Sequence, residues 1–298
     1  MTAVQQHDLE HWRKHGYVII EKFLSDAELE AALHDIHVYM PSWEDYLAHR
    51  HLYEPLVAPG LISAPFPFEG DGLNHVVFHP YLLDFAQTVL ETDDVALTQA
   101  GLMGKYAGKH DYEQTLHVDY GNNTLVYPKN DPSSFIFPVI VYYTDVTVDS
   151  GPTYVVSQEV TGDDVGEPRH RSRDDYPDLY AYETPVTVPA GSALIYSMRT
   201  FHRGSAMRAT QGVRYTHHLT YQPAGPRWIG KNTWLMRGGS PEMDHFVATA
   251  TPKQREMVGF PPVGDPYWDA ETLAGVAKRY PAMDMTPYRE GAAARGVE

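Results

Sequence analysis

The feature that most constrains the fold is an unbroken series of strand-like segments that begins near residue 96. These segments are bounded by clusters of Gly, Pro, Asn and Asp, and no helical periodicity interrupts them. Many short strands with turn signals between them are typical of two sheets closed into a barrel. We therefore predict a mainly β fold with flanking helices, a double-stranded β-helix of the jelly-roll or cupin-like kind. The predicted strands cover residues 97–107, 114–119, 134–143, 152–157, 184–188, 192–197 and 212–222.

The chain is predicted to be one domain over residues 1–298. A helical N-terminal flank covers about 1–95, the barrel core covers about 96–222, and a C-terminal extension covers about 223–298. Helices are expected where apolar residues recur at helical spacing or where a helix-capping sequence begins a segment. The predicted helices are 5–16, 26–40, 81–91 and 270–280, and a small apolar strand is expected at 17–20.

Two segments show no periodicity. The charged segment 158–183 is predicted to be a lid or a disordered insert, since loops of this length are uncommon in compact domains. The last ten residues are predicted to be a loose tail.

Cysteine and charge content exclude several classes of site. The chain has no cysteine, so thiolate metal sites, iron–sulfur clusters and cysteine nucleophiles are excluded, and a metal must be held by His, Asp or Glu. A formal net charge of −16 argues against nucleic acid and against an anionic membrane surface. No hydrophobic signal core or apolar run of transmembrane length is present. We predict a cytoplasmic protein whose partner is a small-molecule substrate.

Two histidines and one carboxylate form a candidate metal site. His117 and Asp119 lie two residues apart at the end of a predicted strand, and His202 follows a buried-strand pattern farther along the chain. Two His and one carboxylate that leave half of an octahedron open are the ligand set of non-heme Fe(II) oxygenases. Arg214 lies in a later strand, and an arginine is suited to hold a carboxylate in a fork. The pattern predicts an iron enzyme that also binds a small dicarboxylate.

Other histidines provide weaker candidates. Alternation in the strand 212–222 places Arg214, Thr216, His218 and Thr220 on one face, and such a polar inward face is costly unless it lines a site. His218 is expected to be hydrogen-bonded on that face rather than a ligand. A second metal pair at His75 and His79 is disfavoured, because Pro80 argues against one helix that spans both.

From about residue 8 to 222, the chain resembles the phytanoyl-CoA dioxygenase family of Fe(II)/2-oxoglutarate oxygenases. The resemblance rests on several motifs in order, which are H-G-Y-V-I-I-E-K-F-L-S, L-H-V-D, G-P-T-Y-V-V, A-G-S-A-L-I-Y, R-T-F-H-R-G-S and R-Y-T-H-H-L-T-Y. One departure is that the family usually continues from G-P-T-Y-V-V into a P-G-S-H turn, whereas here S-Q-E-V leads into the charged segment.

The resemblance implies roles for particular residues. His117, Asp119 and His202 would be the iron ligands, and Arg214 would pair with the distal carboxylate of 2-oxoglutarate. Ser205 and Lys105 would be further contacts of this co-substrate. The implied cofactors are Fe(II), 2-oxoglutarate and O2, and the implied reaction is hydroxylation or another oxidation of a C–H bond in a small organic metabolite.

Two alternative functions follow from the same residues. The barrel could bind a metal without turnover, as the departure after Val156 suggests. It could also be a cupin-like isomerase or hydrolase that needs no 2-oxo acid. Halogenation is disfavoured because the related halogenases have a small residue in place of the carboxylate of Asp119.

Overall fold

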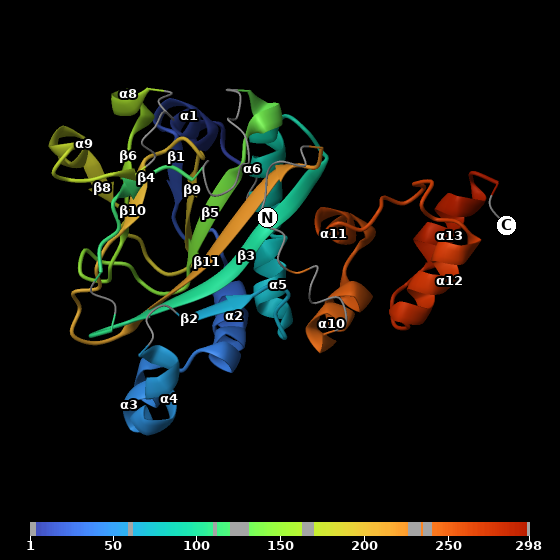
Figure 1. The fold of residues 1–298 in the computed structure, drawn as a ribbon, viewed down its shortest axis with the longest axis horizontal. Coiled ribbons are helices and arrows are strands. Elements are labelled where there is room, and N and C mark those ends of the chain that lie inside the picture. Colours follow the sequence, from blue (N-terminus) through green and yellow to red (C-terminus); the bar gives the residue numbers. More distant parts are fainter. Residues whose placement is uncertain are drawn as a thin grey trace.

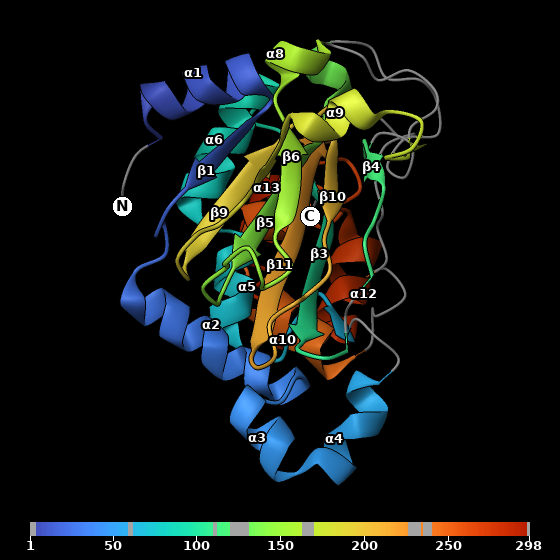
Figure 2. The same cartoon turned by 90° about the vertical axis from the view of Figure 1, so that its left-hand side faces the viewer.

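Two antiparallel sheets form the centre of the molecule (Figures 1 and 2). The computed structural model describes residues 4–58, 62–109, 112–119, 131–162, 170–225, 234 and 240–296. The six-stranded sheet has the order β1 (Tyr17–Ile20), β9 (Ser192–Tyr196), β5 (Phe137–Tyr142), β11 (Val213–Pro223), β3 (Val95–Tyr106) and β2 (Ile62–Pro65). The five-stranded sheet has the order β7 (His170–Arg171), β4 (Leu116–His117), β10 (His202–Gly204), β6 (Thr153–Val156) and β8 (Glu183–Pro185). This architecture confirms the predicted mainly β fold of jelly-roll type.

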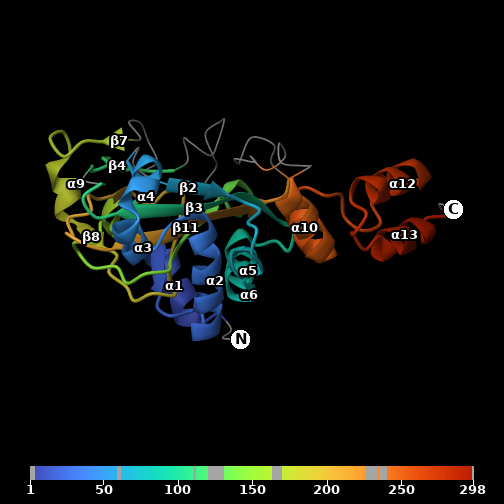
Figure 3. The same ribbon diagram turned by 90° about the horizontal axis from the view of Figure 1, so that it is seen from below.

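Helices cover one face of the six-stranded sheet. Figure 3 shows them on a single side of the strands, and these helices are α1 (Gln6–His15), α2 (Asp26–Tyr39), α5 (Asp71–Val77) and α6 (Pro80–Leu90). A pair of short helices, α3 (Trp43–Ala48) and α4 (Arg50–Val57), projects beyond one end of the sheets (Figure 2). The sequence analysis did not predict α3, α4, α5 or β2. No described helix is both long and apolar enough to cross a membrane.

The predicted helix boundaries follow from local capping. Gly16 ends α1 with a φ of 74°, which glycine adopts without steric cost. Ser25 and Glu28 form the expected capping box of α2. Pro80 occupies the first turn of α6, where its missing N–H costs no hydrogen bond.

The two segments predicted to lack structure contain regular elements in their described parts. The segment 158–183 includes α8 (Gln158–Thr161), β7, α9 (Pro177–Ala181) and the first residue of β8. These elements argue against a disordered insert in the described part of 158–183, and the lid stays a prediction. The prediction of a loose tail is wrong, because α13 (Thr286–Ala293) extends into it and Ala292 is 1% exposed. The sequence Gly121-Asn122-Asn123, which is typical of a turn, lies outside the described residues.

The remaining helices lie after the barrel. They are α10 (Pro241–Thr249), α11 (Pro252–Met257) and α12 (Ala270–Arg279), while the short 3-10 helix η1 (Pro132–Ser134) precedes β5. The helix predicted at 270–280 corresponds to α12, and Asp269 caps it as expected.

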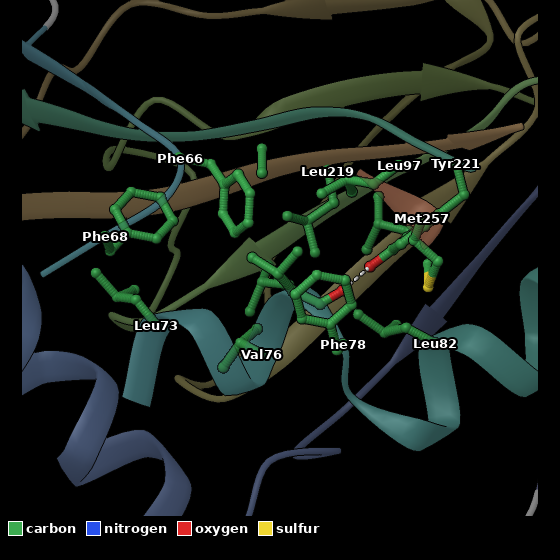
Figure 4. Packing of buried hydrophobic residues seen from close by; sticks show 14 of the residues in the cluster. Phe66, Phe68, Leu73, Val76, Phe78, Leu82, Leu97, Leu219, Tyr221 and Met257 are labelled. Carbon is green, nitrogen blue, oxygen red and sulfur yellow. Dashed lines mark hydrogen bonds between the residues drawn. The ribbon is translucent and has the colours of Figure 1, made fainter. Parts of the chain in front are cut away.

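The main hydrophobic core lies between the helices and the outer face of the six-stranded sheet. Leu219 and Tyr221 of β11 extend toward Val76 and Leu82 of the helices (Figure 4). The Tyr221 hydroxyl donates a hydrogen bond to the Val77 carbonyl oxygen at 2.6 Å, so that this buried polar atom is satisfied. Because alternate residues of a strand point to opposite faces, the same strand presents its polar residues to the space between the sheets.

Candidate functional site

Backbone pairing in the five-stranded sheet brings together the candidate metal ligands. His117 ends β4 and His202 begins β10, and these two residues face each other directly in the antiparallel register. Asp119 lies two residues beyond His117. The strand β10 was not predicted, since His202 was expected to follow a strand rather than to begin one. Pairing of these short strands therefore places side chains from distant parts of the chain side by side.

The three side chains converge on one point. One ligand atom from each of His117, Asp119 and His202 lies within 4.8 Å of the other two. The centroids of the two imidazole rings are 4.5 Å apart, and His202 Nε2 lies 3.7 Å from Asp119 Oδ2. A cluster of this size can surround a single metal ion.

Hydrogen bonds fix the tautomer of both histidines. The Nδ1 atom of His117 lies 2.9 Å from the Thr115 carbonyl oxygen, and Nδ1 of His202 lies 3.0 Å from the Thr200 carbonyl oxygen. A carbonyl only accepts, so each Nδ1 carries a proton, and in the neutral imidazole Nε2 keeps its lone pair. Burial and the neighbouring His202 lower the pKa of His117 to about 4, which keeps its ring neutral at pH 7. The donor set therefore fits a divalent transition metal.

Tyr196 completes the surroundings of the carboxylate. Its hydroxyl donates a hydrogen bond to Asp119 Oδ2 at 2.9 Å. Burial, with Asp119 as a further cause, raises the pKa of Tyr196 well above its usual value, so the hydroxyl remains protonated. Tyr196 was predicted to lie in a strand, but no role was predicted for it.

Two buried cations lie side by side on neighbouring strands. Arg214 of β11 pairs with Lys105 of β3 in the sheet register, and the two residues are 6% and 3% exposed. Arg214 donates to the Gly151 carbonyl oxygen, and its Nε has no hydrogen-bond partner among the described residues. Lys105 Nζ donates to the Ser205 carbonyl oxygen at 2.8 Å. Within the described part of the chain, no acidic residue forms an ion pair with either cation, so this end of the site is suited to an anion.

The surroundings of Lys105 lower its pKa. Burial, and next the charge of Arg214, lower the pKa of Lys105 to about 7. An incoming carboxylate would favour the charged ammonium form.

The triad and the two cations open onto the same cavity of about 260 Å³. The polar face predicted for β11 also lines it, through Arg214, Thr216, His218 and Thr220, as the alternation indicated. His218 is half-buried, with Nε2 3.3 Å from Thr216 Oγ1, in agreement with the expected inner-face histidine. The sequence analysis missed other lining residues, which include Gln99, Met103 and Thr153.

Ser205 is placed differently from the other predicted site residues. Its hydroxyl donates to the Pro152 carbonyl oxygen at 2.6 Å, and Ser205 is not among the described residues that line the cavity. Its carbonyl oxygen instead receives the Lys105 hydrogen bond. The structure thus connects Ser205 to the site through Lys105.

A second cluster of potential ligands lies among the helices. Oε1 of Glu28 is 3.1 Å from His75 Nε2 and 3.4 Å from His79 Nε2. However, Nδ1 of His79 accepts a hydrogen bond from the Tyr81 backbone N–H, so its proton lies on Nε2. A metal at Nε2 would displace this proton and break the cap of α6. We therefore interpret this cluster as a hydrogen-bonded connection between α2, α5 and α6.

Comparison with solved structures identifies proteins of similar fold. The carbocyclase SnoK from nogalamycin biosynthesis, described as non-heme and alpha ketoglutarate dependent, has a TM-score of 0.55 and 18% identity, covering 78% of this chain and 90% of that chain. HygX from Streptomyces hygroscopicus, with nickel and 2-oxoglutarate bound, has a TM-score of 0.54 and 16% identity, covering 75% and 89% of the two chains. The epimerase SnoN, in complex with Fe3+, alpha ketoglutarate and nogalamycin RO, has a TM-score of 0.52 and 16% identity, covering 74% and 83%. At sequence identities this low, the similarity establishes only that the folds are alike.

Sequence comparison identifies the family. No curated protein sequence matches the chain significantly. The family model described as Phytanoyl-CoA dioxygenase (PhyH) matches residues 12–215, a range that includes the metal triad and both buried cations. This family uses Fe(II), 2-oxoglutarate and O2, in agreement with the predicted cofactors. The protein therefore belongs to the phytanoyl-CoA dioxygenase family.

Proposed function

We propose that the protein is an Fe(II)/2-oxoglutarate-dependent oxygenase that oxidises a C–H bond of a small organic metabolite. One observation carries this proposal. A single cavity contains a His–Asp–His triad with both Nε2 atoms available and, on the neighbouring strands, two buried cations without an acidic partner among the described residues. The first feature suits a metal and the second suits a dicarboxylate, which is the pairing that this cofactor set requires.

Four residues are proposed to bind the metal and 2-oxoglutarate, and a fifth is proposed to support them. His117, Asp119 and His202 would hold the metal, and Arg214 would bind the distal carboxylate of 2-oxoglutarate. Lys105 would add a second positive charge to the same end of the cavity. When bound, Fe(II) supplies the activation of O2 that is coupled to decarboxylation of 2-oxoglutarate to succinate and CO2. The protein would supply orientation, exclusion of water and electrostatic stabilisation.

The inner face of β11 would contribute to positioning. Arg214, His218 and Thr220 follow one another along this face, from the cationic end of the cavity to the opposite end. Because desolvation lowers the pKa of His218 to about 4, its ring would be neutral at pH 7. It would therefore offer hydrogen bonds without adding charge beside the metal.

The substrate is proposed to be a small or medium-sized organic molecule. Two proteins of similar fold were solved with such compounds, HygX with hygromycin B and SnoN with nogalamycin RO. The proteins of similar fold differ in their reactions. SnoK is described as a carbocyclase and SnoN as an epimerase. The reaction proposed for the present chain is hydroxylation or a related oxidation.

Formation of succinate from 2-oxoglutarate tests the proposal. Purified protein with Fe(II), ascorbate and O2 should form succinate slowly without an added substrate, and a His117→Ala variant should lose at least about 90% of this activity because one metal ligand is missing. His75→Ala is the matched control, since His75 belongs to the cluster among the helices, and its activity should match that of the wild type. Full turnover in a His117→Ala, His202→Ala double variant would overturn the proposal.

Arg214 provides a separate test of the co-substrate. If the enzyme were an isomerase or hydrolase that needs no 2-oxo acid, Arg214→Ala would retain activity. We expect this variant to bind 2-oxoglutarate at least about tenfold more weakly in anaerobic titrations of the metal-loaded protein, because a charge-assisted fork is lost. Unchanged 2-oxoglutarate affinity would contradict the assigned role.

A further inference from the structure

Tyr196 connects the two sheets at the candidate metal site. It ends β9 in the six-stranded sheet, whereas Asp119 follows β4 in the five-stranded sheet. The Tyr196 hydroxyl spans the space between them and lies 2.9 Å from Asp119 Oδ2. The Tyr196 ring centroid is 4.7 Å from that of His202. Tyr196 is 4% exposed, so the phenol is held by packing before any metal binds.

The carboxylate and the histidines are held in different ways. His117 and His202 lie in paired strands, and each has its Nδ1–H held by a carbonyl oxygen. Asp119 lies beyond the last residue of β4, and its side chain is 18% exposed. The hydroxyl of Tyr196 reaches Oδ2, the carboxylate oxygen that faces His202 Nε2 at 3.7 Å.

We propose that Tyr196 is a positioning residue that holds the carboxylate of Asp119 in the orientation required for metal binding. This inference rests on the proposed function, because it assigns a role to Tyr196 through the metal ligand. The three ligands would then each have a hydrogen-bonding partner that restricts their rotation, as metal ligands in proteins generally do. Tyr196 differs from the other two partners because it belongs to the opposite sheet, and it therefore connects the geometry of the ligands to the packing of the barrel.

Anaerobic titration with Co2+ tests this role without turnover. A Tyr196→Phe variant keeps the ring and loses only the hydroxyl. We expect its dissociation constant for Co2+ to rise by about ten- to a hundredfold, in the range found when partners of metal ligands are removed. The visible absorption of bound Co2+ should also change, because the carboxylate would coordinate with a different geometry. The affinity of the Co2+-saturated variant for 2-oxoglutarate should stay within about twofold of the wild type, since Arg214 and Lys105 are unchanged.

Tyr221→Phe is the matched control. Tyr221 is also a buried tyrosine whose hydroxyl donates a hydrogen bond, but to the Val77 carbonyl oxygen on the helix-covered face of the sheet. If Tyr196 acted only through general packing, the two variants would lose similar thermal stability and both would bind Co2+ like the wild type. That result would overturn the inference.

The outcomes separate this inference from the proposed function. If the wild-type protein binds Co2+ and His117→Ala abolishes binding while Tyr196→Phe does not change it, only the role of Tyr196 is wrong. If the wild-type protein binds no Co2+, both proposals are overturned. A selective loss in Tyr196→Phe, with Tyr221→Phe unaffected, supports the positioning role.

Discussion

The charge of Lys105 should change with pH near neutrality. Burial and Arg214 lower its pKa to about 7, so in the empty site it is mostly charged at pH 6 and mostly neutral at pH 8. Binding of 2-oxoglutarate favours the ammonium, which means that affinity should be higher at pH 6 and should fall as pH rises through about 7. Once the pKa of the empty site is exceeded, the affinity is expected to fall by up to about tenfold per pH unit.

Titration of the metal-loaded protein with 2-oxoglutarate at pH 6, 7 and 8, under anaerobic conditions, measures this dependence. A Lys105→Met variant should bind more weakly at pH 6 and should show little change with pH, because the titrating ammonium is absent. An equal pH dependence in Lys105→Met would assign the effect to another group.

Single residues of the site differed in how far the sequence could predict them. His117, Asp119 and Arg214 could be proposed from the sequence, because few residue types bind a metal or a carboxylate in this way. Their order along the chain also matches that of the family motifs. Their convergence, and that of His202, is observed in the structure, while their roles as ligands and anchor stay predictions. Tyr196 could not be assigned a role from the sequence, because its partner Asp119 lies in the other sheet and no local spacing relates them. The hydroxyl of Ser205 donates to a backbone carbonyl oxygen, which residue type alone does not indicate.

Among the strands, length determined whether a strand could be predicted from the sequence. The long strands β3 and β11 carry enough alternating residues to show their period, and both were predicted within two residues of their observed ends. The strands β7 and β10 have only two and three residues, which is too few for any periodicity to appear, whereas the two-residue β4 lies within the strand predicted at 114–119. These short strands nevertheless carry His117 and His202, so the site depends on tertiary pairing that local patterns do not encode.

Arg203 of β10 forms ion pairs that connect this strand to the segment that contains α9 and β8. Its side chain is 4% exposed, and it donates to both carboxylate oxygens of Glu183, at 2.7 and 2.8 Å, and to Glu113 at 2.6 Å. The exposed Arg173 contacts the same Glu183 from solvent, at 3.0 Å. These two arginines share a partner, but Arg203 is buried and bidentate whereas Arg173 is exposed and makes one contact to Glu183.

We expect Arg203→Ala to lower the free energy of unfolding by about 3 kcal/mol or more, because it leaves the largely buried Glu183 without its bidentate partner. Arg173→Ala should cost less than about 1 kcal/mol, as is typical of solvent-exposed ion pairs. Urea denaturation followed by circular dichroism measures both values. Equal losses in the two variants would show that burial does not determine the strength of these ion pairs.

For the whole molecule, we propose that residues 1–298 form a single domain that includes the C-terminal extension. The main hydrophobic cluster contains Leu9 and Trp12 near one end of the chain and Tyr288 and Ala292 near the other. Phe246 of α10 packs on Phe66 and Phe78, with ring centroids 5.0 and 5.7 Å apart. The family model ends at residue 215, so this packing attaches a segment outside the family match to the core of the barrel. Figure 1 shows α10 and α11 beside β3, with α12 and α13 farther from the sheets.

A shared core predicts cooperative unfolding. Phe246 is 4% exposed, and Phe246→Ala should lower the free energy of unfolding by about 3–5 kcal/mol through lost burial and the cavity left behind. Differential scanning calorimetry should then show one transition in the wild type and one transition at lower temperature in the variant, because the extension and the barrel lose the same contacts together. Leu52→Ala is the control, since Leu52 is 62% exposed on α4 and its loss should change stability by no more than about 0.5 kcal/mol. Two transitions, of which Phe246→Ala shifts only one, would show that the extension folds as a separate unit attached to an independently stable barrel.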